Sequence, residues 1–297
     1  MSIAFLYAGQ GSQHPGMGAD LYETYPQFRA VLDGADLDFD VKEVSFQDSQ
    51  GVLNETRYTQ PCMVAFAVGV TQILADEGIR PDYVAGLSLG EYSALQAAGV
   101  FTPQQAISLV AFRGKVMAEA AKGVPCGMTA VLGLDREKLE QACEQASALG
   151  VVCIANYNCP GQLVIGGHQE AVDEAARLAK ELGARRCMPL KVSGPFHTPL
   201  LKPAGDALAE KFKGETFGEM QVPVLFNCLG REKGPDDTIP ALLERQVQSS
   251  VYMEDTIRRL AELGVDTIVE IGPGKVLSGF VRKTTPEIKT YAVETVA

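Results

Sequence analysis

Apolar and polar positions follow one another along this chain in a pattern that predicts strands alternating with helices. Residues 3–7, 83–87, 222–226 and 267–271 are short apolar runs bounded by polar or turn-forming residues, as expected of buried strands. Longer segments instead carry apolar residues at helical spacing. The predicted helices are 59–77, 89–98, 102–121 and two that begin near 238 and 252. This alternation predicts an α/β class with a large, α/β-hydrolase-like domain built on a mainly parallel sheet.

The pattern changes between Gly127 and Val192, where six segments predict the order β-α-β-β-α-β. These segments are 128–132, 135–149, 151–155, 162–165, 169–182 and 184–191. The order is typical of a small ferredoxin-like α+β unit, and Gly123–Gly127, with Pro125 inside it, is suited to an entry linker. We therefore expect residues 1–123 and 195–297 to form the large domain, residues 124–194 to be inserted into it, and ligands to bind in the cleft between the two.

Composition indicates a globular protein with a substantial core. The chain has 297 residues, of which 46% are hydrophobic. We find no apolar run of membrane-spanning length, and Met1–Tyr7 lacks the basic segment and long apolar segment of a secretion signal. The expectation is a cytoplasmic protein with no membrane partner.

The charge and the cysteine pattern restrict the function further. A net charge of −11 disfavours nucleic acid as a partner, because phosphate binding needs a basic face. The seven cysteines form no C-x-x-C pair and the chain has only three histidines, so we expect reduced core cysteines and no metal site.

The clearest chemical motif is Gly86-x-Ser88-x-Gly90, between a predicted strand and a predicted helix. In that context it predicts a nucleophile elbow, in which the serine occupies a strained turn and its hydroxyl is exposed to a substrate. The amino terminus of the following helix would place N–H groups near the reacting atom. The alternative is a serine that only caps the helix.

A second small-residue loop, Gly9–Gln13, follows the first predicted strand. It is not a dinucleotide-binding loop, because His14 stands where the third glycine of G-x-G-x-x-G belongs. It could bring backbone N–H groups close to a ligand, or it could be a plain turn. Near the other end of the chain, Gly274-Lys275 is not a phosphate-binding loop, because Val269 replaces the first glycine of that motif.

The sequence leaves the roles of two further residues, His197 and Arg113, open. His197, after Gly194-Pro195, is the best candidate for a general base, although a histidine beside a turn is often a capping or surface residue. No aspartate between Ser88 and His197 stands out as the third member of a triad. Arg113 lies on the margin of a predicted apolar helix stripe, where spacing alone favours a side chain that reaches solvent or forms a structural salt bridge over one that meets a bound anion.

Six motifs, in order and spread over the whole chain, resemble the malonyl-CoA:acyl carrier protein transacylases of fatty-acid synthesis and the related polyketide-synthase acyltransferases. The motifs are Gly9-Gln10-Gly11-Ser12-Gln13, Gly86-x-Ser88-Leu89-Gly90-Glu91-Tyr92, Arg113-Gly114, Asn158-x-Pro160-Gly161-Gln162, Pro195-Phe196-His197 and Glu270-Ile271-Gly272-Pro273-Gly274-Lys275-Val276-Leu277.

The resemblance implies a role for each matching residue. Ser88 would carry the acyl group and His197 would be its base. The backbone N–H groups of Gln10 and Leu89 would form the oxyanion hole. Arg113 would bind the malonyl carboxylate.

It also implies that a main-chain carbonyl at Gln246 orients His197, which would explain the missing aspartate. Phe196 looks like the residue that accompanies malonyl rather than methyl-branched substrates. The implied partners are malonyl-CoA and a phosphopantetheinylated acyl carrier protein, with no cofactor and no metal, and we expect a monomer.

The chain departs from the family pattern at three places. Leu87 stands where a histidine usually precedes the serine, and Ala8 stands where a proline usually precedes the glycine loop. Ser249-Ser250-Val251 replaces the usual Asn-Pro-Val, so the assignment at Gln246 depends most on the structure.

Other functions on the same scaffold stay open at this stage. An acyl-thioester hydrolase would use water in place of the second thiol, and a polyketide-type trans-acting acyltransferase would serve another pathway. A non-catalytic protein that binds acyl carrier protein is a third possibility. An arginine suited to a free carboxylate argues against a general hydrolase.

Overall fold

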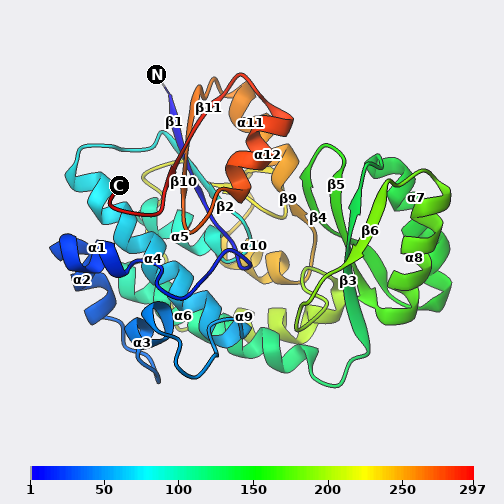
Figure 1. The fold of residues 1–297 in the computed structure, drawn as a ribbon, viewed down its shortest axis with the longest axis horizontal. Coiled ribbons are helices and arrows are strands. Elements are labelled where there is room, and N and C mark those ends of the chain that lie inside the picture. The colour runs from blue at the N-terminus through cyan, green and yellow to red at the C-terminus, as the bar shows by residue number, and fades with distance from the viewer. Residues whose placement is uncertain (1) are drawn as a thin grey trace.

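The computed structural model describes residues 2–297 and contains two main sheets that lie side by side, each with its own helices (Figure 1). One sheet has four parallel strands and the other has five mostly antiparallel strands. The α/β class with a mainly parallel sheet, as predicted, is confirmed.

The parallel sheet has the strand order β11-β10-β1-β2, so the first strand of the chain lies at its centre beside β10. Residue Ile3 pairs with Thr267, and Tyr7 pairs with both Ile271 and Gly86. All four strands therefore end at one edge, beside the loops that follow β1 and β2. The strands are β1 (Ile3–Tyr7), β2 (Tyr83–Gly86), β10 (Thr267–Ile271) and β11 (Lys289–Val293).

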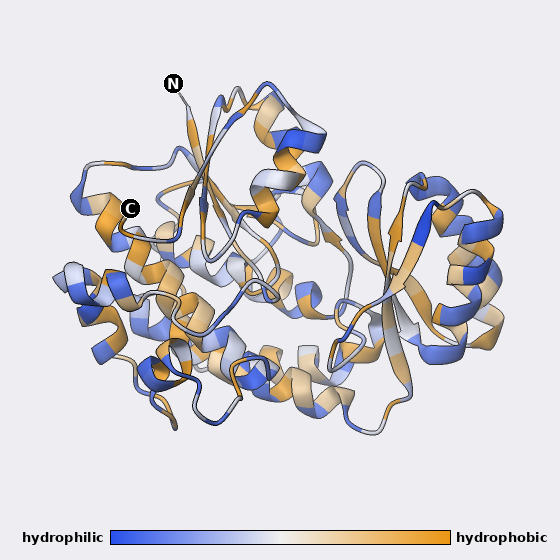
Figure 2. Cartoon of the chain, in the orientation of Figure 1, coloured by the Kyte–Doolittle hydropathy of each residue, from blue (hydrophilic) through white to orange (hydrophobic). Residues whose placement is uncertain are grey.

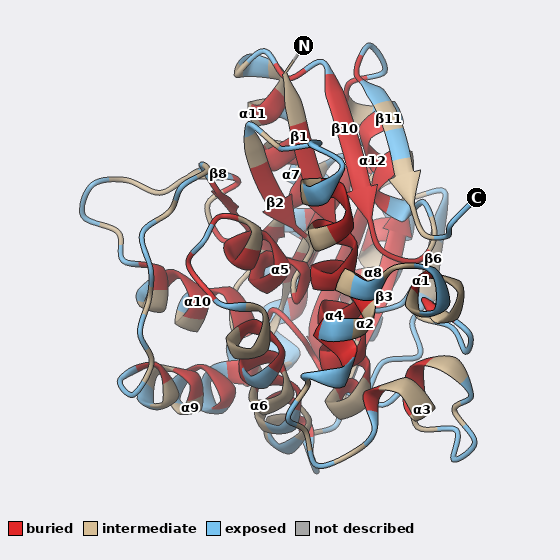
Figure 3. Ribbon diagram, turned by 90° about the vertical axis from the view of Figure 1, so that its left-hand side faces the viewer, coloured by how far each residue is buried: buried red, intermediate tan, exposed pale blue. Residues whose placement is uncertain are grey.

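Three helices form a layer on one face of this sheet, two of them in contact with its strands and the third packed on the longest of the three. They are α4 (Thr56–Asp76), α5 (Gly90–Ala97) and α6 (Pro103–Ala121). Figure 3 shows β1, β10, α4 and α5 mostly buried, whereas β11 at the sheet edge has only exposed and intermediate positions. The predicted start of α6 is observed, since the Thr102 hydroxyl accepts a hydrogen bond from Gln105 N–H and Pro103 occupies the first turn.

Helix α4 has the length and mean hydropathy of a membrane-spanning segment, although we expected no such run from the sequence. In this structure 78% of that apolar window is buried inside the protein, which is the pattern of a core helix. The helix begins before the predicted residue 59 and continues through Pro61.

The second sheet has the order β6-β3-β5-β4-β9. Its first four strands alternate with two helices in the predicted order β-α-β-β-α-β, and α7 and α8 bear both apolar and hydrophilic residues (Figure 2). Strand β9, from the carboxy-terminal part of the chain, joins the sheet beside β4, so the inserted segment shares its sheet with the flanking chain. The boundaries at 124 and 194 stay a prediction. The elements are β3 (Cys126–Leu132), α7 (Arg136–Ala146), β4 (Val152–Cys159), β5 (Gln162–His168), α8 (Gln169–Glu181), β6 (Arg186–Pro189) and β9 (Val251–Tyr252).

The predicted strand 222–226 is much shorter than expected. Only β7 (Leu225–Phe226) forms, and it pairs with β8 (Arg231–Glu232), while Val224 makes a single parallel bridge to Val84 of β2. The chain that follows β7 therefore lies beside the end of β2. The remaining helices are α1 (Ala19–Thr24), α2 (Pro26–Asp33), α3 (Val41–Phe46), α9 (Lys202–Phe212), α10 (Ile239–Val247), α11 (Met253–Glu262) and α12 (Val276–Thr284).

Candidate active site

Ser88 lies in a sharp turn between β2 and α5, with a φ of 55° that L-residues rarely adopt. The turn is tight enough to demand both flanking glycines. A Cβ on Gly86 would lie 2.1 Å from the carbonyl carbon of Gly90, and one on Gly90 would lie 2.3 Å from the Tyr7 carbonyl oxygen. The motif thus forms a strand-turn-helix elbow that holds Ser88 between the sheet edge and the amino terminus of α5.

The Ser88 hydroxyl is hydrogen-bonded to His197, although 109 residues separate them in the sequence. The Ser88 Oγ to His197 Nε2 distance is 2.8 Å. On the other side of the ring, Nδ1 lies 2.9 Å from the main-chain carbonyl oxygen of Gln246. Since a carbonyl oxygen only accepts, Nδ1 carries the proton and the Nε2 lone pair faces the serine. A backbone carbonyl thus occupies the place that an aspartate takes in a triad.

His197 is almost completely buried, with 4% of its surface exposed. Burial, reinforced by the positive charge of Arg113, lowers the pKa of His197 to about 4. The imidazole is therefore neutral at physiological pH and able to accept a proton from Ser88.

The lowered pKa predicts how Ser88 reactivity depends on pH. Protonation of His197 removes the base, so reactivity is lost only as the pH falls through the pKa of the folded protein. We expect inactivation by a neutral sulfonyl fluoride to be constant from about pH 6 to pH 7.5 and to fall towards pH 4. Rates of inactivation measured across this range check the prediction, and a midpoint at or above the ordinary histidine pKa would contradict it.

Arg113 lies wholly inside the protein, at 0% exposure, on the face of α6 that meets α4. Its Nη1 donates to Gln60 Oε1 at 2.8 Å, and its Nη2 donates to Gln246 Oε1 at 2.9 Å and to Ser88 Oγ at 3.1 Å. The guanidinium also lies 5.6 Å from the centre of the Tyr92 ring. The arginine is thus brought directly to the nucleophile.

The sequence-based preference for an Arg113 side chain that reaches solvent or forms a salt bridge is wrong. The side chain is buried, and no carboxylate within residues 2–297 lies within 4.0 Å of it. Burial lowers the pKa of Arg113, and its hydrogen-bond partners are all neutral. A buried cation with only neutral partners is an electrostatically incomplete site, suited to an anion.

The glycine loop after β1 packs against the elbow. A Cβ on Gly9 would lie 2.6 Å from the Leu87 carbonyl oxygen, so only glycine permits this approach. The N–H groups of Gln10 and Leu89 find no acceptor within the described chain, whereas Ser88 N–H donates to Asn227. Both residues expected to form an oxyanion hole therefore have backbone N–H groups that are not used within the protein.

Phe196 is buried and precedes His197 directly. Its ring lies close to Gly194, since a Cβ on Gly194 would be 3.0 Å from the ring carbon Cε1. Its neighbour His197 has a φ of 59°, so the chain turns sharply at this point. The segment that returns from the second sheet thus delivers both residues to the edge of the parallel sheet.

Sequence reasoning missed three polar residues that contact the expected site. Gln60 and Gln246 hold Arg113, but only Gln246 was expected, and only for its main chain. Asn227 and Glu91 form a buried pair beside Ser88, in which Asn227 N–H donates to Glu91 Oε2. Only Asn227 carried a signal in the sequence, as a polar side chain in the otherwise apolar run from Val222 to Leu229.

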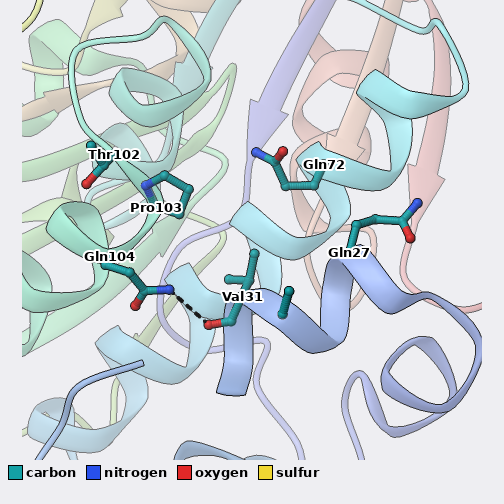
Figure 4. Close-up of a pocket in the computed structure, with 7 residues that line it drawn as sticks. Gln27, Val31, Gln72, Thr102, Pro103 and Gln104 are labelled. Atoms are coloured by element: carbon teal, nitrogen blue, oxygen red, sulfur yellow. Dashed lines mark hydrogen bonds between the residues drawn. The ribbon is translucent and has the colours of Figure 1, made fainter. Parts of the chain in front are cut away.

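Two surface pockets lie away from these residues. One, of about 340 Å³, is lined by residues of α2, α4 and the start of α6, where Gln104 Nε2 donates to the Val31 carbonyl oxygen (Figure 4). None of the expected site residues lines it. Within residues 2–297 no group of three or more His, Cys, Asp or Glu side chains is placed to hold a metal ion.

Comparison with known proteins adds an independent line of evidence. The model of the acyl transferase domain family matches residues 4–297. A malonyl CoA-acyl carrier protein transacylase of Bacillus subtilis is 42% identical over 294 residues, which cover 98% of this chain and 93% of that protein. A Staphylococcus aureus protein of the same name is 37% identical over 295 residues, 98% of this chain and 95% of its own length.

Solved structures with the same fold carry similar names. The transacylase MCAT of Streptococcus pneumoniae superposes with a TM-score of 0.95 at 46% identity, covering 99% of this chain and 96% of its own. A malonyl-transacylase in complex with its type II PKS acyl-carrier protein superposes with a TM-score of 0.95 at 38% identity, covering 100% of this chain and 97% of that one.

Proposed function

The chain belongs to the acyl transferase domain family and is an acyltransferase, and we propose that it moves a malonyl group from malonyl-CoA to the phosphopantetheine thiol of an acyl carrier protein through an ester on Ser88. The observation that carries the proposal is the 2.8 Å contact between Ser88 Oγ and His197 Nε2 beside a buried, unpaired Arg113. This arrangement joins an activated nucleophile to a site for the free carboxylate of malonyl.

In the first half-reaction His197 Nε2 takes the Ser88 proton while Oγ attacks the thioester carbon. The carbonyl oxygen becomes an oxyanion that the N–H groups of Gln10 and Leu89 stabilise, each by about 3 kcal/mol. When the tetrahedral intermediate collapses, the carbon–sulfur bond breaks and His197 returns the proton to the CoA thiolate. Ser88 then carries the malonyl group as an ester.

The second half-reaction reverses these roles with a different thiol. The carrier-protein phosphopantetheine thiol gives its proton to His197 and attacks the ester carbon. Ser88 recovers the proton as the ester bond breaks, and the malonyl group leaves on the carrier. Proton and acyl group balance without a redox or metal cofactor.

Arg113 binds the malonyl carboxylate in this scheme. Gln60 and Gln246 engage one N–H on each of its two terminal nitrogens through their amide oxygens, which fixes the plane of the guanidinium. A carboxylate that reaches the remaining donors would complete a charge-assisted pair away from water, where such pairs are strong. The same contact would orient the thioester carbon towards Ser88.

The proposed acceptor of the malonyl group is inferred from similar proteins. Because similar proteins are named for an acyl carrier protein, and one is described in complex with it, we propose the same partner here. Fatty-acid and polyketide carriers present the same thiol, so the scheme holds for either pathway. Action as a cytoplasmic monomer is part of the same proposal.

Transfer and hydrolysis give different products, which separates this function from its main rival. The enzyme would be mixed with malonyl-CoA and a phosphopantetheinylated carrier protein, and the carrier mass followed with time. Malonyl-carrier should accumulate as fast as CoA is released. Release of CoA with free malonate and no labelled carrier would identify a thioester hydrolase instead.

Phe196 provides a test of acyl-group selectivity. A buried ring beside the base should disfavour an α-methyl branch by ~1–3 kcal/mol. Phe196→Ser is therefore expected to narrow the preference for malonyl-CoA over methylmalonyl-CoA, measured as the ratio of kcat/KM values. Equal use of both substrates by the unmodified protein would remove the basis of this assignment.

A further inference from the structure

The side chain of Asn227 joins the backbone of the nucleophile to the end of the strand that precedes it. It follows β7 directly and is completely buried. Its Oδ1 accepts a hydrogen bond from Ser88 N–H at 2.8 Å, and its Nδ2 donates to the Gly86 carbonyl oxygen at 2.6 Å. One primary amide thus joins the residue at the turn to the last residue of β2.

The turn needs such a restraint because Ser88 holds a sparsely populated backbone conformation. A conformation of this kind persists only where the surroundings fix it. The amide of Asn227 satisfies the Ser88 N–H, and Gln246 Nε2 donates to the Ser88 carbonyl oxygen at 2.8 Å. Both backbone groups of Ser88 are therefore held, while the next amide, Leu89 N–H, is left free.

The backbone of Asn227 is itself held by α5 and β9. Its N–H donates to Glu91 Oε2 at 2.6 Å, and its carbonyl oxygen accepts from Tyr252 N–H at 2.9 Å. Glu91 is buried three residues after Ser88, and its other carboxyl oxygen has no hydrogen-bond partner. Burial raises the pKa of Glu91 to about 8. A group this costly to bury needs an explanation beyond packing.

We propose that Asn227 is a positioning residue for acyl transfer, which fixes the Ser88 backbone so that Oγ faces His197 and Leu89 N–H faces the oxyanion, and that Glu91 holds Asn227 in this position. Ser88 is hydrogen-bonded to Asn227, Asn227 is hydrogen-bonded to Glu91, and Glu91 lies in α5, the helix that follows Ser88 in the chain. The inference rests on the proposed function, in which Ser88 is the nucleophile.

The test compares the chemical step with substrate binding. Asn227→Ala is expected to slow malonylation of Ser88 at saturating malonyl-CoA by about 10- to 100-fold, because small displacements of reacting groups have effects of this size. KM for malonyl-CoA should be unchanged, since Arg113 is untouched. Inactivation by a neutral sulfonyl fluoride should slow by the same factor, because that reagent needs the elbow but not Arg113.

A buried neighbour supplies the matched control. Cys228→Ala alters the same turn, but the Cys228 thiol contacts the Leu242 carbonyl oxygen and not the elbow. Thermal melts give the folded fraction of each variant, and the rates are divided by it. Corrected in this way, the malonylation and inactivation rates of Cys228→Ala should equal those of the unmodified protein. The inference would be overturned if Asn227→Ala and Cys228→Ala malonylate Ser88 at the same rate. It would also be overturned if Asn227→Ala raises KM for malonyl-CoA without slowing malonylation.

Glu91 variants keep the test decisive if Asn227→Ala does not fold. Glu91→Ala releases Asn227 without altering its amide and should slow both reactions, whereas Glu91→Gln retains an acceptor for Asn227 N–H and should lose less. Equal rates for Glu91→Ala and the unmodified protein would overturn the inference alone. Absence of malonylation in the unmodified protein would instead contradict the proposed function, and sulfonyl fluoride reactivity would still report on positioning.

Discussion

Replacing Ser88 with alanine is expected to abolish formation of the acyl-enzyme while leaving the fold intact. The strained turn is imposed by backbone contacts, namely the approach of Gly86 to Gly90 and the hydrogen bonds from Ser88 N–H to Asn227 and from Gln246 to the Ser88 carbonyl oxygen. None of these needs the hydroxyl. The measurement is the mass of the protein after exposure to malonyl-CoA, together with its thermal melting curve.

His197→Ala is the informative comparison for this variant. It keeps the nucleophile but removes the base, so acylation should continue at a rate lower by about 10²- to 10⁴-fold. A Ser88→Ala protein that still becomes malonylated, with the label mapped to another residue, would show that Ser88 is not the acyl carrier.

Arg113→Ala is expected to lower the malonyl-to-acetyl ratio of kcat/KM sharply. The substitution removes one partner of a buried charge pair, a loss of about 2–5 kcal/mol or roughly 30- to 4,000-fold for malonyl transfer. Acetyl has no carboxylate to pair, so its transfer should be unchanged or improved. The ratio matters because Arg113 also donates to Ser88 Oγ, and a change at the nucleophile would affect both substrates alike.

Arg113→Lys separates charge from geometry. Lysine keeps the charge but lacks the planar fork that Gln60 and Gln246 hold, so the malonyl-to-acetyl ratio should fall by less than in Arg113→Ala. Melting curves of both variants show how much of any loss is structural. An unchanged ratio in Arg113→Ala would mean that the arginine does not bind the substrate carboxylate.

The parts of the site that sequence reasoning found are those with local determinants. The elbow could be predicted from residues 86–90 alone. The backbone passes so close to Gly86 and Gly90 that a side chain would not fit at either position. The bounds of β10, Thr267–Ile271, were predicted as observed because a buried parallel strand is a continuous apolar run. The start of α6 was predicted from Thr102-Pro103, because proline favours the first turn of a helix.

The parts that were missed depend on contacts between distant segments. From its spacing, Arg113 was expected to reach solvent or to form a structural salt bridge, because spacing on α6 does not reveal that Gln60 and Gln246 bind its guanidinium. Asn227 follows a two-residue strand, and its contacts with Ser88 form where Val224 bridges to β2. Pairings across more than a hundred residues leave no periodic signal in the chain.

Short elements were missed for a different reason. Helices α1 and α3 span only Ala19–Thr24 and Val41–Phe46, too few residues to display a repeating apolar stripe. Strand β11 lies at the sheet edge with alternating exposed and partly buried positions, so its apolar signal is weak. Of the predicted strand 222–226, only Leu225 and Phe226 form a strand in the structure. These two residues pair with β8, whereas the rest of the segment has no antiparallel partner.

The most direct test of the account is the intact mass of the enzyme, followed through both half-reactions. After exposure to malonyl-CoA the protein should gain the mass of one malonyl group, located on Ser88, and it should lose that mass when phosphopantetheinylated carrier protein is added, as the carrier gains it. A protein that gains no mass, or whose label leaves as malonate at the same rate without the carrier, would contradict acyl transfer through Ser88.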